Sequence, residues 1–182
     1  METASSNKAG TRVVAYVAIG SNIEAEKHIP AALELLREEA TVLSVSRMYQ
    51  SAAVGRPEQA DYRNGVVAIE TSLIPLLFRD QVLRPIEASL GRIRSGDAYA
   101  ARTIDLDLIV YGDHVFEKDG LHLPATDIRE RTFVAVPLLE LAPDLVLPDD
   151  GTRLADCDVA HDLASLEHDA ALTTTVKGSA TA

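Results

Sequence analysis

Apolar and polar positions follow regular spacings along most of this chain, and the spacings predict alternating strands and helices. The run VVAYVAI at 13–19 is short, rich in β-branched residues and closed by GSN, which is typical of a buried strand that ends in a turn. Apolar residues at 29–40 then recur on one face of a helical period. They predict an amphipathic helix, in which Pro30 is tolerated because it falls in the first turn.

The following segments continue this pattern. TVLSVSRMYQS at 41–51 alternates apolar and polar residues as a half-buried strand does, and GVVAIET at 65–71 predicts another strand. A second helix is expected at about 75–91, with a kink at Pro85, and it leads into the strand RTIDLDLIVYGD at 102–113. The order strand, helix, strand, strand, helix, strand predicts an α+β fold, the ferredoxin-like βαββαβ sandwich.

The rest of the chain is expected to elaborate this core. Short β-like pieces at 115–123 and a helix near 129–141 follow, and the acidic segment 156–169 has only a weak pattern. The ends, 1–11 and 171–182, are small, polar and aperiodic, so they are expected to be disordered tails around one domain at 12–170. A doubly wound nucleotide-binding fold is excluded because its alternating units and glycine-rich fingerprint are missing.

Composition narrows the classes of function. The chain has 182 residues, 47% of them hydrophobic, which suits a single core. Lys and Arg number 17 against 28 Asp and Glu, a net charge of −11, so we expect no nucleic-acid partner. Cys157 is the one cysteine, so we expect no internal disulfide, and no apolar leader is seen at the N-terminus, so we expect a cytoplasmic protein. No apolar run approaches the roughly 20 residues of a membrane-spanning helix, so we expect no membrane span.

Two carboxylates lie inside the apolar strand at 102–113. Side chains alternate along a strand, so Asp105 and Asp107 share one face while their apolar neighbours point into the core. Adjacent carboxylates repel unless they are solvated, protonated or bridged by a cation. Mg²⁺ is usually held by one or two carboxylates together with substrate phosphates, so the pair indicates a phosphate-handling metal site.

A structural explanation remains open at this point. The pair is also compatible with an acidic, solvent-facing edge strand, and Asp156 and Asp158 repeat the same spacing without supporting context. The first pair differs because Arg92, Arg94 and Arg102 precede it closely in an acidic chain. Such arginines suit a polyphosphate, or they simply neutralise the aspartates. Arg102 reaches the aspartate face only if the strand begins after it.

Taken together, several segments make the chain resemble a known family. The motifs AIGSN, DYRNGVVAIET, GRIR, RTIDLDLIVYGD and RERTFVAVPLLELAPDL occur in this order over roughly 13–150. In this order and spacing they are similar to the 6-hydroxymethyl-7,8-dihydropterin pyrophosphokinases of folate biosynthesis. The resemblance implies a kinase-type transferase that moves the β,γ-pyrophosphoryl group of ATP to the pterin hydroxymethyl oxygen, with two Mg²⁺ ions in a ferredoxin-like fold.

The resemblance also implies a role for individual residues. Asp105 and Asp107 would bind metal, and Arg92 and Arg102 would be catalytic. The remaining positions would bind the two substrates: Glu87, Arg94 and Arg131 for ATP, and Ser51, Ala52, Val54, Tyr62, Asn64 and Phe133 for the pterin. These types suit a flat heteroaromatic ring, which is held between aromatic faces and recognised by a side-chain amide.

The chain departs from the family pattern at several positions. Ala125 stands where members commonly have a His that contacts ATP phosphate, and His122 has the opposite strand parity to Ala125, so it does not replace that His directly. Ala52 and Ala53 replace two prolines, and Tyr99 replaces a Trp of the catalytic loop. An active enzyme is therefore weighed against a degenerate member that binds pterin or nucleotide without turnover, and against a different Mg²⁺-dependent phosphotransferase.

Overall fold

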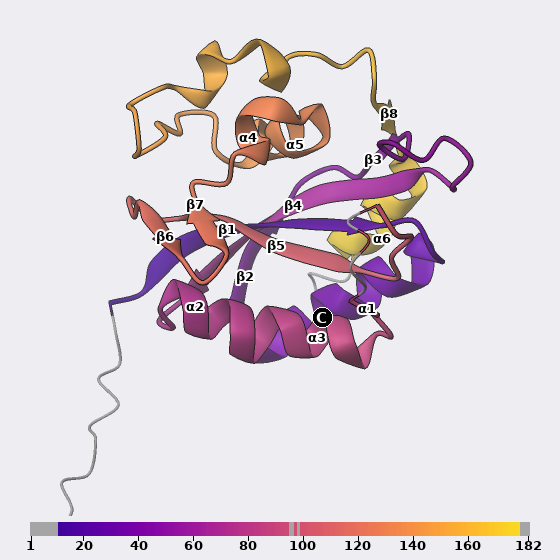
Figure 1. Ribbon diagram of the computed structural model, residues 1–182, viewed down its shortest axis with the longest axis horizontal. Coiled ribbons are helices and arrows are strands. Elements are labelled where there is room, and N and C mark those ends of the chain that lie inside the picture. Colours follow the sequence, from indigo (N-terminus) through magenta and orange to yellow (C-terminus); the bar gives the residue numbers. More distant parts are fainter. Residues whose placement is uncertain (1–10, 95–96, 98, 179–182) are drawn as a thin grey trace, which may run out of the picture.

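The computed structural model describes residues 11–94, 97 and 99–178, and its centre is one antiparallel sheet (Figure 1). The strand order is β5-β1-β4-β3-β8, with β2 also paired to β4. The strands are β1 (Val13–Ser21), β2 (Thr41–Val45), β3 (Tyr49–Ser51), β4 (Tyr62–Thr71), β5 (Asp105–Tyr111) and β8 (Glu167–His168). A separate hairpin joins β6 (Phe116–Lys118) to β7 (Leu121–Leu123). The order β5-β1-β4-β3 is that of a ferredoxin-like fold, so the predicted fold class is confirmed.

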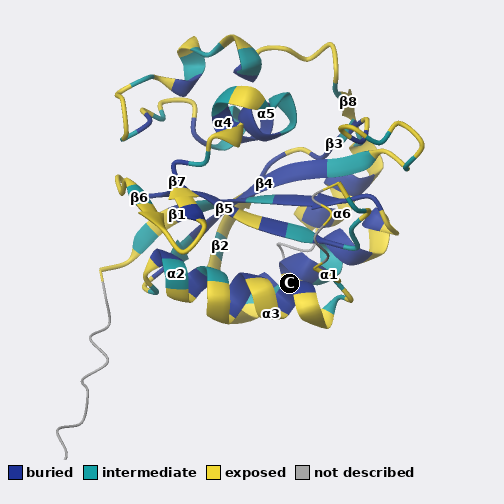
Figure 2. Ribbon diagram, viewed as in Figure 1, coloured by how far each residue is buried: buried dark blue, intermediate teal, exposed yellow. Residues whose placement is uncertain are grey.

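Helices cover both faces of the sheet (Figure 1). One face carries α1 (Ala25–Glu39), the consecutive helices α2 (Pro75–Phe78), η1 (Arg79–Leu83) and α3 (Arg84–Ser89), and α6 (Ala170–Gly178). The other face carries α4 (Asp127–Glu130) and α5 (Thr132–Leu141). The alternation of the strands therefore supplies two cores, and the central strands are mostly buried (Figure 2).

Two predicted elements, the strand at 41–51 and the helix at 75–91, differ in detail from the structure. The expected strand at 41–51 is two strands, because residues 46–48 leave the ladder between β2 and β3 while both strands pair with β4. The expected helix at 75–91 is present, and η1 within it is a π-helical turn. In this turn the Arg84 N–H donates to the Arg79 carbonyl, directly before Pro85, which has no N–H to continue the regular pattern.

The C-terminal tail prediction is wrong for residues 171–178. They belong to α6, and Leu172 and Val176 are buried in the core beside α1. The acidic segment 156–169 begins at the last residue of a short 3₁₀ turn, Leu154–Asp156, and contains a second such turn, Asp158–Ala160, and then β8. The tail residues 1–10 and 179–182 lie outside the described part of the chain. Within the described part, no helix is long and apolar enough to cross a membrane.

Candidate active site

The two aspartates of β5 open onto a cavity of about 420 Å³. In the pairing of β5 with β1, Asp105 is opposite Gly20 and Asp107 is opposite Ala18. These small partners leave the space above the carboxylates open, while Leu106 and Leu108 point into the opposite core. The predicted arrangement, with both carboxylates on one face, is present.

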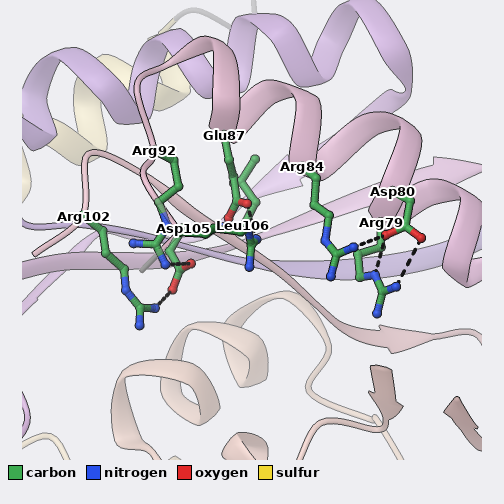
Figure 3. Close-up of polar contacts among 9 residues, drawn as sticks. Arg79, Asp80, Arg84, Glu87, Arg92, Arg102, Asp105 and Leu106 are labelled. Atoms are coloured by element: carbon green, nitrogen blue, oxygen red, sulfur yellow. Dashed lines mark hydrogen bonds and ion pairs between the residues drawn. The ribbon is translucent and has the colours of Figure 1, made fainter. Parts of the chain in front are cut away.

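Two arginines converge on Asp105 (Figure 3). Arg92 Nη2 lies 3.3 Å from Asp105 Oδ1, and Arg102 Nη1 donates to Asp105 Oδ2. Because β5 begins at Asp105, Arg102 lies before the strand, and the alternation of side chains along β5 does not decide which face Arg102 points to. In the described part of the chain no ion pair involves Asp107, so the neutralisation is confined to one of the two carboxylates.

Asn22 fixes the backbone of Arg102, a role that the sequence analysis missed. Its Oδ1 accepts from the Arg102 N–H at 2.7 Å, and its own N–H donates to the Arg102 carbonyl at 3.1 Å. Its Nδ2 also donates to Gln59 Oε1 at 3.1 Å. The turn after β1 therefore ties Arg102 to the loop at 52–61, and the signal available in the sequence was the GSN that closes the first strand.

Glu87 lies buried beside the free edge of β5 (Figure 3). Its Oε1 accepts from the Leu106 N–H at 2.9 Å, and Oε2 accepts from Arg94. Burial raises the pKa of Glu87, while these two donors oppose that change. Glu87, Arg92 and Arg94 are not among the described residues of the cavity wall. Their predicted contacts with ATP and phosphate stay predictions, and the observed contacts are with β5 and with one another.

Asp107 has an unusual electrostatic setting. Its side chain is exposed to the water of the cavity, but protein surrounds it on most sides. Loss of bulk solvent, together with the nearby charges of Asp105 and Glu87, raises the pKa of Asp107 to about 7, although Arg102 opposes the rise. A carboxylate in this setting is stabilised by any cation that enters the cavity.

The same cavity contains the residues predicted to hold a pterin. All of them line the cavity: Ser51, Ala52, Val54, Tyr62, Asn64 and Phe133. Asn64 is buried, and its Nδ2 donates to Ser51 Oγ at 2.9 Å. A Cβ on Gly20 would lie 2.8 Å from Asn64 Oδ1, so glycine is needed there to admit the amide. The bond to Ser51 uses one of the two N–H groups of Nδ2, so the amide keeps a donor as well as the acceptor Oδ1 for a ligand.

Comparison with known proteins decides the family. A family model described as 7,8-dihydro-6-hydroxymethylpterin-pyrophosphokinase matches residues 16–143. This chain belongs to that family. It is 39% identical over 140 residues to the 2-amino-4-hydroxy-6-hydroxymethyldihydropteridine pyrophosphokinase of Haemophilus influenzae, covering 75% of this chain and 86% of the relative. The protein of the same name from Pseudomonas aeruginosa is 39% identical over 137 residues, covering 74% and 83%.

Solved structures confirm the fold. A Plasmodium falciparum HPPK-DHPS structure with pterin and p-hydroxybenzoate superposes with a TM-score of 0.67 at 12% identity. The match covers 86% of this chain but 44% of that one, so the present chain corresponds to less than half of the larger protein. At this identity the likeness speaks for the fold alone.

One departure from the family pattern, Ala125, lies in the wall formed by residues 120–134. Ala125 lines the cavity, and its N–H donates to the Ile109 carbonyl at 2.8 Å, which anchors this wall to β5. Arg131 lines the same cavity, and its predicted contact with ATP stays a prediction. His122 and Asp127 line it too, although the sequence analysis did not assign them a role. Strand β7 ends at Leu123, so the parity that separates His122 from Ala125 does not extend beyond it.

Tyr99 lies at the mouth of the cavity. Its ring packs against Gly55, whose φ is +71° and whose Cβ would lie 3.3 Å from the ring. Gln59 Nε2 donates to the Tyr99 carbonyl at 2.9 Å. The side chain is half exposed, so Tyr99 covers the cavity only in part. Residues 95, 96 and 98 of the same loop lie outside the described part.

Proposed function

We propose that this chain transfers pyrophosphate from ATP to 6-hydroxymethyl-7,8-dihydropterin and releases AMP and the pterin diphosphate. One observation carries the proposal: a single cavity joins the charged residues Asp105, Asp107 and Arg131 to the flat-ring residues Tyr62 and Phe133. The charged end suits a triphosphate, and the other end suits a planar heterocycle. The family to which the chain belongs, described as a pterin pyrophosphokinase, agrees with a cavity that takes both a phosphate group and a pterin.

In the proposed complex the pterin ring lies between Tyr62 and Phe133. Asn64 Oδ1 accepts a hydrogen bond from the edge of the ring, and the second N–H of Nδ2 is available to donate one, since the bond to Ser51 uses only the first. The backbone at 51–54 would complete the recognition of that edge. Tyr62 and Asn64 come from β4, which is fixed on both sides by neighbouring strands, so the ring is held by a rigid element.

The donor set at the charged end fits magnesium. Asp105 and Asp107 offer carboxylate oxygens on one face, and the open cavity leaves room for phosphate and water ligands. In the described part, no third His, Cys, Asp or Glu completes a protein-only site, which agrees with ions held jointly by the protein and ATP. Bound Mg²⁺ would neutralise the developing phosphate charge.

The reaction requires positioning more than covalent assistance. The hydroxymethyl oxygen forms a bond to the β-phosphorus, the bond from that phosphorus to the oxygen bridging to the α-phosphate breaks, and AMP leaves with the electron pair. The hydroxyl proton passes to water, since a loose transition state does not need prior deprotonation. Arg92 and Arg102 then supply charge beside Asp105, where the polyphosphate would lie.

A second candidate function is binding without turnover. Ala125 in the cavity wall favours it, because a charged contact with phosphate is missing where family members commonly have a His. Ala52 and Ala53 also leave the loop beside the pterin wall less restricted than prolines would. The retained Asp105, Asp107 and Arg102 favour the enzyme.

Release of AMP separates the two functions. The assay contains ATP, Mg²⁺ and the protein, with and without 6-hydroxymethyl-7,8-dihydropterin, and Asp105→Ala serves as the blank. Asp156→Ala is the matched control, because Asp156 is exposed and belongs to the other Asp-x-Asp pair. The enzymatic function is supported if the wild type and Asp156→Ala release AMP when pterin is present and Asp105→Ala does not. Binding of pterin without release of AMP supports the function of binding without turnover.

We keep three further assignments as proposals from composition. The net charge of −11 argues against nucleic-acid binding, and the low cysteine content suits the cytoplasm. Small molecules are then the expected partners, namely ATP and the hydroxymethyl-dihydropterin.

A further inference from the structure

The C-terminal end of the described chain packs behind the cavity wall that contains Asn64 and Gly65. This C-terminal segment, residues 167–178, comprises β8 and α6 and lies beyond residues 16–143, which the family model matches. Strand β8 pairs with β3, placing Tyr49 opposite His168 and Gln50 opposite Glu167. Leu172 and Val176 of α6 are buried in the core that contains β1 and α1. The segment is therefore an integral part of the fold.

Two hydrogen bonds join this segment to Met48, where the chain leaves the ladder between β2 and β3. The Met48 N–H donates to Thr173 Oγ1 at 2.8 Å, and the Met48 carbonyl accepts from the Asp169 N–H at 2.9 Å. Met48 is fully buried, so both backbone groups would lose hydrogen-bond partners without the segment. Thr173 itself is buried.

An ion pair makes a second connection. Arg63 Nε donates to Asp169 Oδ2 at 2.7 Å, with both side chains about one-fifth exposed. Asp169 Oδ1 also accepts from the Leu172 N–H at 2.9 Å, which caps the start of α6. Arg63 lies on β4 between Tyr62 and Asn64, and it holds that strand to the C-terminal segment.

Met48 carries the first connection to the cavity. Its Sδ would lie 2.6 Å from a Cβ on Gly65, so the thioether packs directly against that backbone. Gly65 and its neighbour Asn64 both line the cavity. The C-terminal segment thus supports β3 and β4 behind the pterin wall, whereas no contact described for it reaches Asp105 or Asp107.

We propose that Thr173 and Asp169 are positioning residues for the pterin half of the cavity. Thr173 holds Met48 against Gly65, and Asp169 holds Arg63 beside Asn64; each acts through those residues and touches no substrate. The inference rests on the proposed function, because it takes the wall at Tyr62, Asn64 and Phe133 as the pterin site. Weakening either contact should loosen pterin binding and spare ATP binding.

The principal test replaces Thr173 with Val, which keeps the shape and removes the hydroxyl. Thr174→Val is the matched control, because the Thr174 hydroxyl donates to the Ala170 carbonyl within the same helix and the side chain is exposed. Steady-state kinetics give KM for each substrate and kcat, and equilibrium titrations give Kd for pterin and for ATP. Thr173→Val should raise KM and Kd for pterin by about fivefold or more, with the ATP constants within about twofold.

Two further variants separate positioning from general destabilisation. Thr173→Ser retains a hydroxyl and should restore the pterin constants to near wild-type values. Asp169→Asn keeps a helix cap but removes the charge, so it should produce a smaller rise, about two- to threefold, in KM for pterin. Unfolding midpoints of all variants show whether the loss of pterin affinity follows stability or the hydroxyl.

The outcomes distinguish this inference from the proposed function. If Thr173→Val leaves the pterin constants unchanged, or weakens ATP and pterin equally, the inference is overturned while the enzyme stands. If the wild type binds pterin but makes no AMP, the proposed function fails and the pterin titrations still decide the inference. A wild type that binds no pterin overturns both.

Discussion

The chain contains the same Asp-x-Asp spacing in two places, and the two pairs differ in their structural surroundings. Asp105 and Asp107 belong to a strand beside the cavity, with Arg92 and Arg102 directed at the first of them. Asp156 and Asp158 belong to consecutive 3₁₀ turns and are exposed. A strand places its alternate carboxylates on one face, whereas short turns leave theirs in water. The difference teaches that the spacing alone does not define a metal site.

The largest expected effect comes from removing a carboxylate of the first pair, with the same change in the second pair as its control. Asp107→Ala should lower the rate of AMP formation by at least about a thousandfold, because a bridging position for the ions and phosphates is lost. Asp158→Ala should leave the rate unchanged. Single-turnover assays with matched circular dichroism measure both effects. Residual activity of Asp107→Ala near the wild-type level would contradict the metal role.

A gain of function should follow from adding a charge partner to the first pair's cavity. Ala125→His places an imidazole in the wall shared with Arg131 and Asp107. A recovered contact with phosphate is worth about 1.5–3 kcal/mol, which corresponds to roughly ten- to hundredfold in kcat/KM for ATP. Steady-state kinetics at fixed pterin measure the gain, and an unchanged value would show that this wall lies away from the phosphates.

Magnesium should distinguish the pairs without any turnover. Mg²⁺ at about a hundredfold excess over its Kd stabilises a protein by about 2.7 kcal/mol when it binds the folded state alone. We expect the unfolding midpoint of the wild type and of Asp158→Asn to rise with Mg²⁺ and ATP, and that of Asp107→Asn to rise much less. Equal rises in all three proteins would place the ions elsewhere.

The smallest effect concerns stability in the absence of metal. The pKa of Asp107 is raised in the folded protein, so its folded-state penalty is absent below the ordinary value of 3.8 and grows as pH rises toward 7. Asp107→Asn should therefore be more stable than the wild type at pH 8 by about 1 kcal/mol, a figure kept small because cavity water screens the charges. Denaturant titrations should show the gain disappearing below about pH 4.

The sequence was sufficient for the core fold because periodicity there is strong. Strand β1 and helix α1 follow patterns set by residues that point into one core, and tertiary structure did not override them. Helix α6 could not be predicted in the same way, because its run of threonines has low helix propensity and only Leu172 and Val176 form an apolar face. Its one local signal was Asp169, which caps the first turn.

The candidate site was predictable where one strand carries neighbouring residues, and less so where distant segments meet. Asp105 and Asp107 needed only the alternation of β5. The role of Glu87 could not be read from its helix, because its partners are the backbone of Leu106 and the side chain of Arg94, and no spacing encodes a carboxylate beside the edge of a strand. His122 was set aside on strand parity, yet the end of β7 brings it and Ala125 into one wall.

The carboxylate of Glu87 also bears on how copies of this protein behave toward one another. Strand β5 lies at the edge of the sheet, and an uncovered edge offers its N–H and C=O groups to a strand of another molecule. Glu87 takes the outward N–H of Leu106, and the Ala125 N–H takes the outward carbonyl of Ile109. On the far side of the sheet the border is shared by β8, which is only two residues long, and by β2, which pairs with β4. The β5 border is thereby a poor template for aggregation, and the same side chain that steadies the aspartate strand also protects that border.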